Sequence, residues 1–275
     1  MNKKNVNNRS DKITKESSLE KASDSANIIA RVSLAFSKIS LYLLVFLLPI
    51  FFLPWTKGAL DFNKQALLFA LVFLALLFYA FKILITGRFD FKPSVLHIGA
   101  LSLMVTVGIS TLFSLYRTAS FWGWPIDIAA SFSTLLFFIL FYFLIVNIFS
   151  KPRDIFLLLS VLVFSGFTAA SFAILQLFNK SILPWDFLRS TSFNTVGTFN
   201  ALAIFSALLL PVIMSLFSKG KTAVKLISLA AGAFLLFLLF LINFKTAWLV
   251  LLFSAASFLC LSLPGLKNKQ NYYWV

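Results

Sequence analysis

The sequence has very few of the side chains that most enzymes use for catalysis or metal binding. It contains one cysteine, Cys260, and one histidine, His97, which excludes an intrachain disulfide framework and any multi-cysteine or multi-histidine metal site. No glutamate follows Glu20, and the carboxylates beyond it are scattered aspartates. Catalysis by a pair of glutamates is therefore excluded within this chain, and no metal or cofactor is expected.

Charged residues of all kinds are also scarce, at 12% of the 275 residues against 60% hydrophobic residues. A soluble domain does not have this composition, so the sequence predicts a membrane protein. The few charges are unbalanced, with 24 Lys and Arg against 9 Asp and Glu and a net charge of +15. In a polar chain this excess would indicate nucleic-acid binding, so its meaning here depends on where the charges lie.

The N-terminal part of the chain, residues 1–38, is polar and carries eight of the basic residues. Such a segment buries too little apolar surface to offset its ordering entropy, so it is predicted to be a disordered basic tail up to about residue 25. No cleavage site of the small-x-small type follows the first apolar run, which is therefore expected to be an uncleaved anchor. Residues 39–264 are predicted to form the membrane domain, and residues 265–275 a short C-terminal end.

Eight apolar runs make up the membrane domain, each close to the roughly 20 residues needed to cross a bilayer. None shows strand-like alternation, so we expect an all-α, polytopic transmembrane helical bundle of about eight spans rather than a barrel. The end of the bundle is open to two interpretations, since residues 226–264 also fit one span followed by a re-entrant half-helix. The predicted spans are 39–55, 65–85, 95–115, 128–149, 155–178, 199–217, 226–243 and 247–264.

The distribution of the basic residues between the connections explains the charge. Counted by connection, 18 fall on one side of the predicted bundle and 6 on the other. This asymmetry is the positive-inside pattern, and it predicts an even number of spans with a cytoplasmic N-terminus. The net positive charge therefore indicates how the chain is oriented in the membrane. The lipid bilayer is the expected partner, with anionic lipids at the N-terminal tail and no nucleic acid.

The longest predicted external connection, 179–200, contains the first candidate site. Its stretch from Asn194 to Asn200, with Gly197 between them, is suited to presenting backbone N–H groups and amides to an anion. An interfacial loop without chemistry is the alternative interpretation. Lys245, between the last two spans, likewise either extends to the interface or neutralises a phosphate from the outer leaflet.

Several short motifs resemble the O-antigen ligase and polysaccharide polymerase family of bacterial membranes. The family's glycine-to-asparagine element at the start of a span is matched by Gly197–Ala203, with Pro211 further along. Its Ser-Arg-x-Ala-Trp element is similar to Asn243–Trp248, in which Lys245 keeps the positive charge but loses the bidentate fork of arginine. The remaining similar positions are Pro54 at the end of the first span, Asn63, Lys64 and Gln65 at the second, and Ser120, Phe121, Trp122 and Gly123 after the third.

The resemblance implies a multi-pass protein of the bacterial inner or plasma membrane that transfers a glycan from a polyprenyl diphosphate to an acceptor at the external face, without a metal. It implies Lys245 and Arg189 as phosphate-binding residues, with Arg117 behind them, and Asn200 and Gly197 as residues that order the entrance of the sixth span. The family's catalytic histidine lies in a large loop after the ninth of about twelve spans. No catalytic residue is assigned in this sequence, and the chain is expected to be incomplete.

Two other functions remain open. A polytopic transporter or flippase-like protein would be expected to contain an inverted repeat and paired charges at mid-membrane depth, and the sequence has neither a convincing repeat nor a midplane acid. A noncatalytic membrane protein or fragment is compatible with the same apolar runs.

Overall fold

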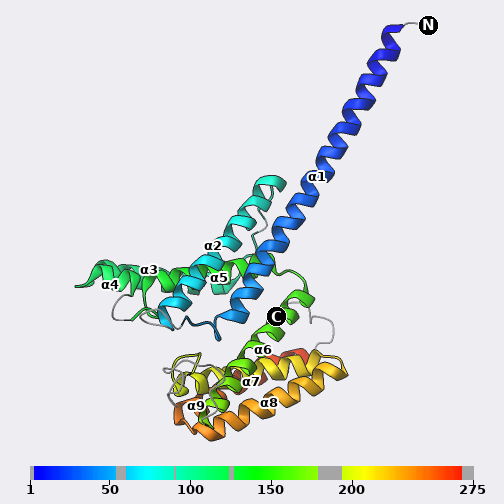
Figure 1. Ribbon diagram of the computed structural model, residues 1–275. Helices are drawn as coiled ribbons and strands as arrows, with labels where there is room; N and C mark the ends of the chain where they lie inside the picture. The colour runs from blue at the N-terminus through cyan, green and yellow to red at the C-terminus, as the bar shows by residue number, and fades with distance from the viewer. Residues whose placement is uncertain (1–2, 54–59, 90, 124–126, 179–193, 268–275) are drawn as a thin grey trace. The chain divides into compact units, whose positions relative to one another are not determined.

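The computed structural model describes residues 3–53, 60–89, 91–123, 127–178 and 194–267, and these ranges are helical apart from short turns and connections (Figure 1). The chain divides into two compact units. Unit 1 consists of Met1–Leu43 and Leu68–Ser150, and unit 2 of Leu44–Leu67 and Lys151–Val275. The helices are α1 (Lys3–Leu47), α2 (Asp61–Thr86), α3 (Val95–Leu112), α4 (Arg117–Trp122), α5 (Phe132–Ile148), α6 (Pro152–Leu177), α7 (Phe199–Lys219), α8 (Thr222–Ile242) and α9 (Lys245–Lys267).

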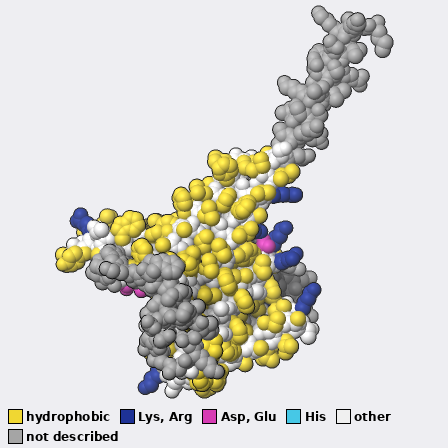
Figure 2. All heavy atoms as spheres, in the orientation of Figure 1, with side chains coloured by type: hydrophobic (Ala, Val, Ile, Leu, Met, Phe, Trp, Pro, Cys, Tyr) yellow, Lys and Arg dark blue, Asp and Glu magenta, His cyan; other side chains and the backbone are white. Residues whose placement is uncertain are grey.

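Five of these helices are long and apolar enough to cross a membrane: α1 from Ser25 onward, α2, α6, α7 and α8. Apolar stretches of α3, α5 and α9 are shorter. Leucine and phenylalanine side chains are exposed along the helices. Figure 2 shows hydrophobic side chains over much of the visible described surface. Lipid is the solvent that suits such a surface, so the protein is an all-helical, multi-pass membrane protein over its described residues. The count of about eight spans stays a prediction.

Helix caps account for differences between the predicted runs and the helices. The Ser131 hydroxyl accepts a hydrogen bond from the Thr134 N–H at 3.3 Å, so α5 begins at Phe132, inside the predicted run 128–149. A capping hydroxyl satisfies a backbone N–H that the first turn leaves without a partner, and it therefore fixes where the helix starts. At 17 residues, α5 is about 26 Å long.

The N-terminal segment differs from its prediction. Disorder was expected up to about residue 25, whereas α1 is helical from Lys3. The segment contains neither glycine nor proline before Pro49, so no residue interrupts a helix that continues from the apolar part of α1. Low apolar content therefore does not by itself determine the backbone conformation.

Polar contacts connect the helices of unit 1. The Ser37 hydroxyl of α1 donates to the Ala75 carbonyl of α2 at 2.8 Å, a contact between helices that retains its strength away from water. The Lys92 ammonium donates to the Val146 carbonyl at 3.1 Å and to the Ser150 hydroxyl at 2.7 Å. A cation is favourable at a helix C-terminus, so Lys92 stabilises the end of α5.

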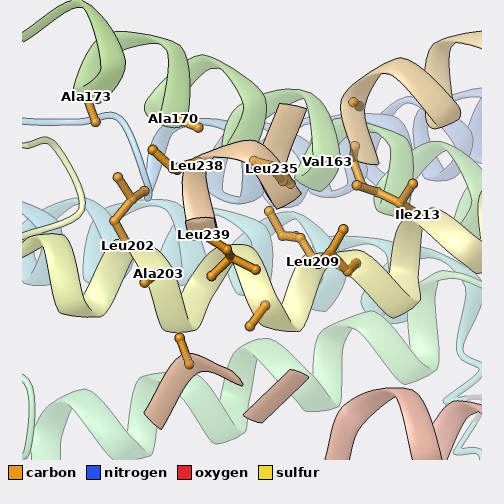
Figure 3. Close-up of a cluster of buried hydrophobic side chains, with 14 of the residues drawn as sticks. Val163, Ala170, Ala173, Leu202, Ala203, Leu209, Ile213, Leu235, Leu238 and Leu239 are labelled. Carbon is orange, nitrogen blue, oxygen red and sulfur yellow. The ribbon is translucent and has the colours of Figure 1, made fainter. Parts of the chain in front are cut away.

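Unit 2 is built around α7, which packs against α6, α8 and α9. Figure 3 shows Ala173 of α6 near Leu202 of α7, and Val163 near Ile213, so α6 and α7 run in opposite directions. Short connections at Gly220–Lys221 and Asn243–Phe244 reverse the chain between α7, α8 and α9. Residues 226–264 are thus divided between α8 and α9. Of the two, α8 is long enough to be a candidate span, and α9 has a shorter apolar stretch, so both interpretations of this region stay open. The core includes Ala170, Ala203, Ala207, Leu209, Leu235, Leu238, Leu239 and Ala247.

Gly166 lies where α6 and α7 pack closely, because an added Cβ would overlap Leu209 Cδ1. Gly166→Val is expected to lower the free energy of unfolding by about 2 kcal/mol through overpacking. The measurement is the thermal midpoint of the detergent-solubilised protein, followed by tryptophan fluorescence. Adding Leu209→Ala to Gly166→Val is expected to recover part of the loss, with Leu209→Ala alone completing the cycle. Strict additivity of the two substitutions would contradict this contact.

Candidate functional site

The turn that precedes α7 is organised by a buried asparagine. The Asn194 side chain is fully buried, and its Oδ1 accepts hydrogen bonds from the N–H groups of Val196 and Gly197, both at 3.0 Å. Gly197 has a φ of +139°, which an L-residue rarely adopts, and Thr198 then caps α7 by accepting from the Ala201 N–H at 3.1 Å. The sequence Asn-x-x-Gly-Thr thus forms a turn and a helix cap in succession.

This turn changes the predicted anion cradle. The N–H groups of Val196, Gly197 and Ala201 donate within the protein, so they do not face a ligand. The N–H groups of Phe199 and Asn200 belong to the first turn of α7, where a helix has no acceptor of its own. Asn200 is exposed in this first turn. The anion-binding capacity of the segment therefore lies at the helix start rather than in the turn.

Lys64 is a functional candidate to which the sequence analysis assigned no role, although it lies within a family-like motif. It lies in the first turn of α2, and its ammonium donates to the Thr195 carbonyl at 2.5 Å and to the Val196 carbonyl at 3.1 Å. The side chain is half-buried in unit 2. A lysine ammonium has three donors, and two of them are used in these bonds within the part of the chain that the structure describes. The available signal was its position, because Lys64 lies within one of the family-like motifs.

Buried polar atoms without partners occur in the turn before α7 and within α7. Asn194 Nδ2, Thr195 Oγ1 and Ser206 Oγ are buried and have no hydrogen-bond partner within the part of the chain that the structure describes. A buried polar atom left unpaired costs about 1–3 kcal/mol. Such atoms are therefore expected to bind water or a ligand that brings its own donors and acceptors.

The turn between α8 and α9 lies at the same end of unit 2. Asn243 has a φ of +48° and donates its N–H to the Leu239 carbonyl at 2.9 Å, which closes α8. Lys245 is the exposed first residue of α9. Phe244 and Trp248 pack against the same core cluster as Val196 and Phe199. We call this region, formed by Lys64, Asn194–Asn200 and Asn243–Lys245, the polar end of unit 2.

The electrostatics of the polar end favour an anion. It combines two cations, Lys64 and Lys245, with the N-termini of α7 and α9, each of which carries a partial positive charge. Asp61 in the first turn of α2 is an acidic residue in the vicinity of Lys64. Lysine binds a phosphate as a point charge, and helix N-termini add directed N–H donors.

The predicted site residues fall into three groups. Gly197 and Asn200 lie at the start of α7, and Lys245 lies at the start of α9, both in unit 2. Arg117 is the exposed first residue of α4 and belongs to unit 1. Arg189 lies outside the described residues.

The family-like motif Ser120–Gly123 contributes Ser120 to the wall of a cavity of about 570 Å³ in unit 1. Its wall contains Ser114 and Ser120, whose hydroxyls lie 2.6 Å apart, and Asp127. Gly123 ends α4 with a φ of +83°. Gly123 therefore forms a tight turn, and Ser120 lines a cavity whose wall contains both polar and apolar side chains.

His97 contacts aromatic side chains in unit 1. Its Nδ1 lies 3.0 Å from the Tyr142 hydroxyl, and the rings of Phe91 and Tyr142 pack against it edge-on. The residues that the structure describes contain no group of three or more His, Cys, Asp or Glu side chains that could hold a metal ion.

The fold and the polar end define a multi-pass helical membrane protein with an anion-attracting end on one helical unit. Comparisons with protein-family models, with curated proteins and with solved structures each find no match.

The contribution of Lys64 to the polar end can be measured directly. Lys64→Met removes both hydrogen bonds to the Thr195 and Val196 carbonyls and is expected to lower the free energy of unfolding by about 1.5 kcal/mol. It should also speed proteolysis within the turn. Lys151→Met, at an exposed lysine that makes no side-chain cap, is the control in unit 2. Equal thermal midpoints for the two variants would show that the Lys64 bonds do not hold the turn.

Proposed function

We propose that this protein is a membrane glycan transferase of the O-antigen ligase and polymerase type. It acts on a polyprenyl-diphosphate-linked glycan at the external face of the bacterial inner or plasma membrane. The proposal includes about eight spans and a cytoplasmic N-terminus, as the distribution of 18 and 6 basic residues predicts.

The observation that carries the proposal is the meeting of three motifs that are far apart in the sequence. The Lys64 ammonium is hydrogen-bonded to the carbonyls of Thr195 and Val196, directly before the Gly197 motif. Phe199 of the Gly197–Ala203 motif and Trp248 of the Asn243–Trp248 motif pack against one core cluster. Motifs that merely reflected apolar composition would not be expected to gather around two cations and two helix N-termini.

The chemistry of the polar end suits a diphosphate leaving group. A glycan on a polyprenyl diphosphate is already activated, so the protein must stabilise the negative charge that grows on the phosphate as the glycosidic bond breaks. Lys245 and Lys64 supply positive charge, and the first N–H groups of α7 supply directed donors. Arg189 and Arg117 remain phosphate-side candidates by resemblance. The proposal assigns no general base.

Deletion of the gene in the source bacterium tests the function. The deletion strain is expected to lose a surface glycan and to accumulate its lipid-linked precursor on the external leaflet, and the wild-type gene should restore the glycan. An unchanged set of surface glycans would refute the transferase. Accumulation of the precursor on the cytoplasmic leaflet would instead identify a transporter or flippase.

The proposed orientation gives a separate prediction. Lys221 and Lys245 flank α8, whose 21 residues span about 31 Å. In a Cys260→Ser background, a membrane-impermeant maleimide should label Lys245→Cys in intact spheroplasts, and Lys221→Cys only after permeabilisation. The reverse pattern would contradict the orientation. Labelling of both positions from one side would contradict α8 as a span.

A further inference from the structure

Unit 2 contains a groove between α7, α8 and α9, with a volume of about 570 Å³. It lies away from the polar end, toward the C-terminus of α7 and the N-terminal half of α8. Its walls are almost entirely apolar, with Ser218 and Ser228 as the polar members of the lining. The lining includes Ile213, Met214, Phe217, Leu236, Leu251 and Phe258.

Small residues on α8 leave space for the groove. Both α8 and α9 pack on α7, and Gly232 and Ala233 leave room on the α8 side. A Cβ added at Gly232 would only touch Ile213, at 3.5 Å, so the space beside Gly232 is not filled by its neighbours. A groove of this kind in membrane helices favours a hydrocarbon chain, because it offers almost no hydrogen-bonding group to water.

Three exposed lysines, Lys219, Lys221 and Lys225, lie where α7 turns into α8. The Lys225 ammonium is 5.9 Å from the ring centroid of Phe217, a residue of the groove wall. The positive charge therefore borders the groove. No acidic residue occurs on α7, α8 or α9, so these helices provide no carboxylate to neutralise the three lysines.

We propose that this groove binds a diacyl anionic phospholipid. An acyl chain lies along α7, α8 and α9, and the phosphate is bound by Lys219, Lys221 and Lys225. Apolar volume and positive charge meet at one place, and an anionic phospholipid is the membrane component that satisfies both. The site is distinct from the polar end and does not depend on the proposed transferase activity.

The test is a native mass spectrometry titration of the purified protein with phosphatidylglycerol and with phosphatidylcholine of the same acyl chains. Each lysine near a phosphate strengthens binding by about fivefold, so phosphatidylglycerol is expected to bind at least tenfold more tightly. Lys219→Gln, Lys221→Gln and Lys225→Gln combined should abolish this preference. The matched control, Lys38→Gln, Lys82→Gln and Arg88→Gln combined, removes the same charge from unit 1 and should retain it.

The groove is tested with Gly232→Leu and, independently, with Leu236→Trp at an exposed lining position. Either substitution fills the groove and should weaken both lipids at least fivefold, while Gly99→Leu, at an open position on α3, should not. Equal affinities for the two lipids, or a preference that survives the lysine variant, would overturn the proposal. If neither filling variant weakened lipid binding, the acyl chain would not occupy the groove, and the preference would come from the surface lysines alone. Loss of a dimer, rather than of lipid, would identify a second copy as the occupant.

Discussion

Lys245→Ala is expected to lower glycan transfer about a hundredfold, because one preorganised donor to the charge that develops in the transition state is lost. Lys245 is exposed at the first residue of α9, beside the turn that closes α8. Its charge and the N-terminus of α9 act on the same region. The measurement is consumption of a polyprenyl-diphosphate-linked glycan by the protein in proteoliposomes.

The loss should appear mainly in kcat, since the interaction strengthens as the bond to the phosphate breaks. Lys245→Arg should retain most of the activity, because the guanidinium restores the charge. The control is Lys151→Ala, which removes an exposed lysine at the N-cap of α6. Activity of Lys245→Ala within twofold of wild type, at an unchanged thermal midpoint, would exclude Lys245 from phosphate binding.

Gly123→Ala is expected to destabilise unit 1 by about 3 kcal/mol, through left-handed strain and a backbone clash. Gly123 has a φ of +83°, and an added Cβ would lie 2.5 Å from Ile128 Cα and 2.6 Å from the Asp127 carbonyl oxygen. These are backbone atoms, so no rotamer change relieves the overlap. The measurement is the thermal midpoint, together with the proteolytic sensitivity of the connection between α4 and α5.

Gly87 provides the matched control for this prediction. It also has a positive φ, +61°, but a Cβ there would meet no atom within 4 Å. Gly87→Ala should therefore cost only the left-handed strain, about 1 kcal/mol. Equal midpoints for Gly87→Ala and Gly123→Ala would mean that the Ile128 backbone does not approach Gly123 closely.

The helices could be predicted from the sequence because backbone groups in lipid must be satisfied within the segment, so long apolar runs have few alternatives to helix. The predicted run 199–217 corresponds to α7, and 226–243 to α8. Helix ends were less predictable. The hydroxyl of Ser131 moves the start of α5, and hydrophobicity carries no information about such a cap. The orientation and about eight spans stay predictions.

The candidate site could be predicted only in part. Gly197, Asn200 and Lys245 were identified from motifs, and they lie at one end of unit 2. Lys64 was not singled out, because its contact with Thr195 and Val196 joins residues more than 130 positions apart. The use of the Val196 and Gly197 N–H groups by Asn194 was also not foreseen, since an asparagine in a turn can face either the backbone or a ligand.

The sequence by itself determined that this is a helical membrane protein, because apolar length and scarce charge leave no other solvent than lipid for most of its residues. It also determined which cations were available for an anionic substrate. Only the tertiary structure decided which of them act together, because that depends on helix direction and on close packing at residues such as Gly166 and Ala173. The Lys64 hydrogen bonds join the start of α2 to the turn before α7, and the packing of α8 and α9 on α7 leaves a groove beside three lysines.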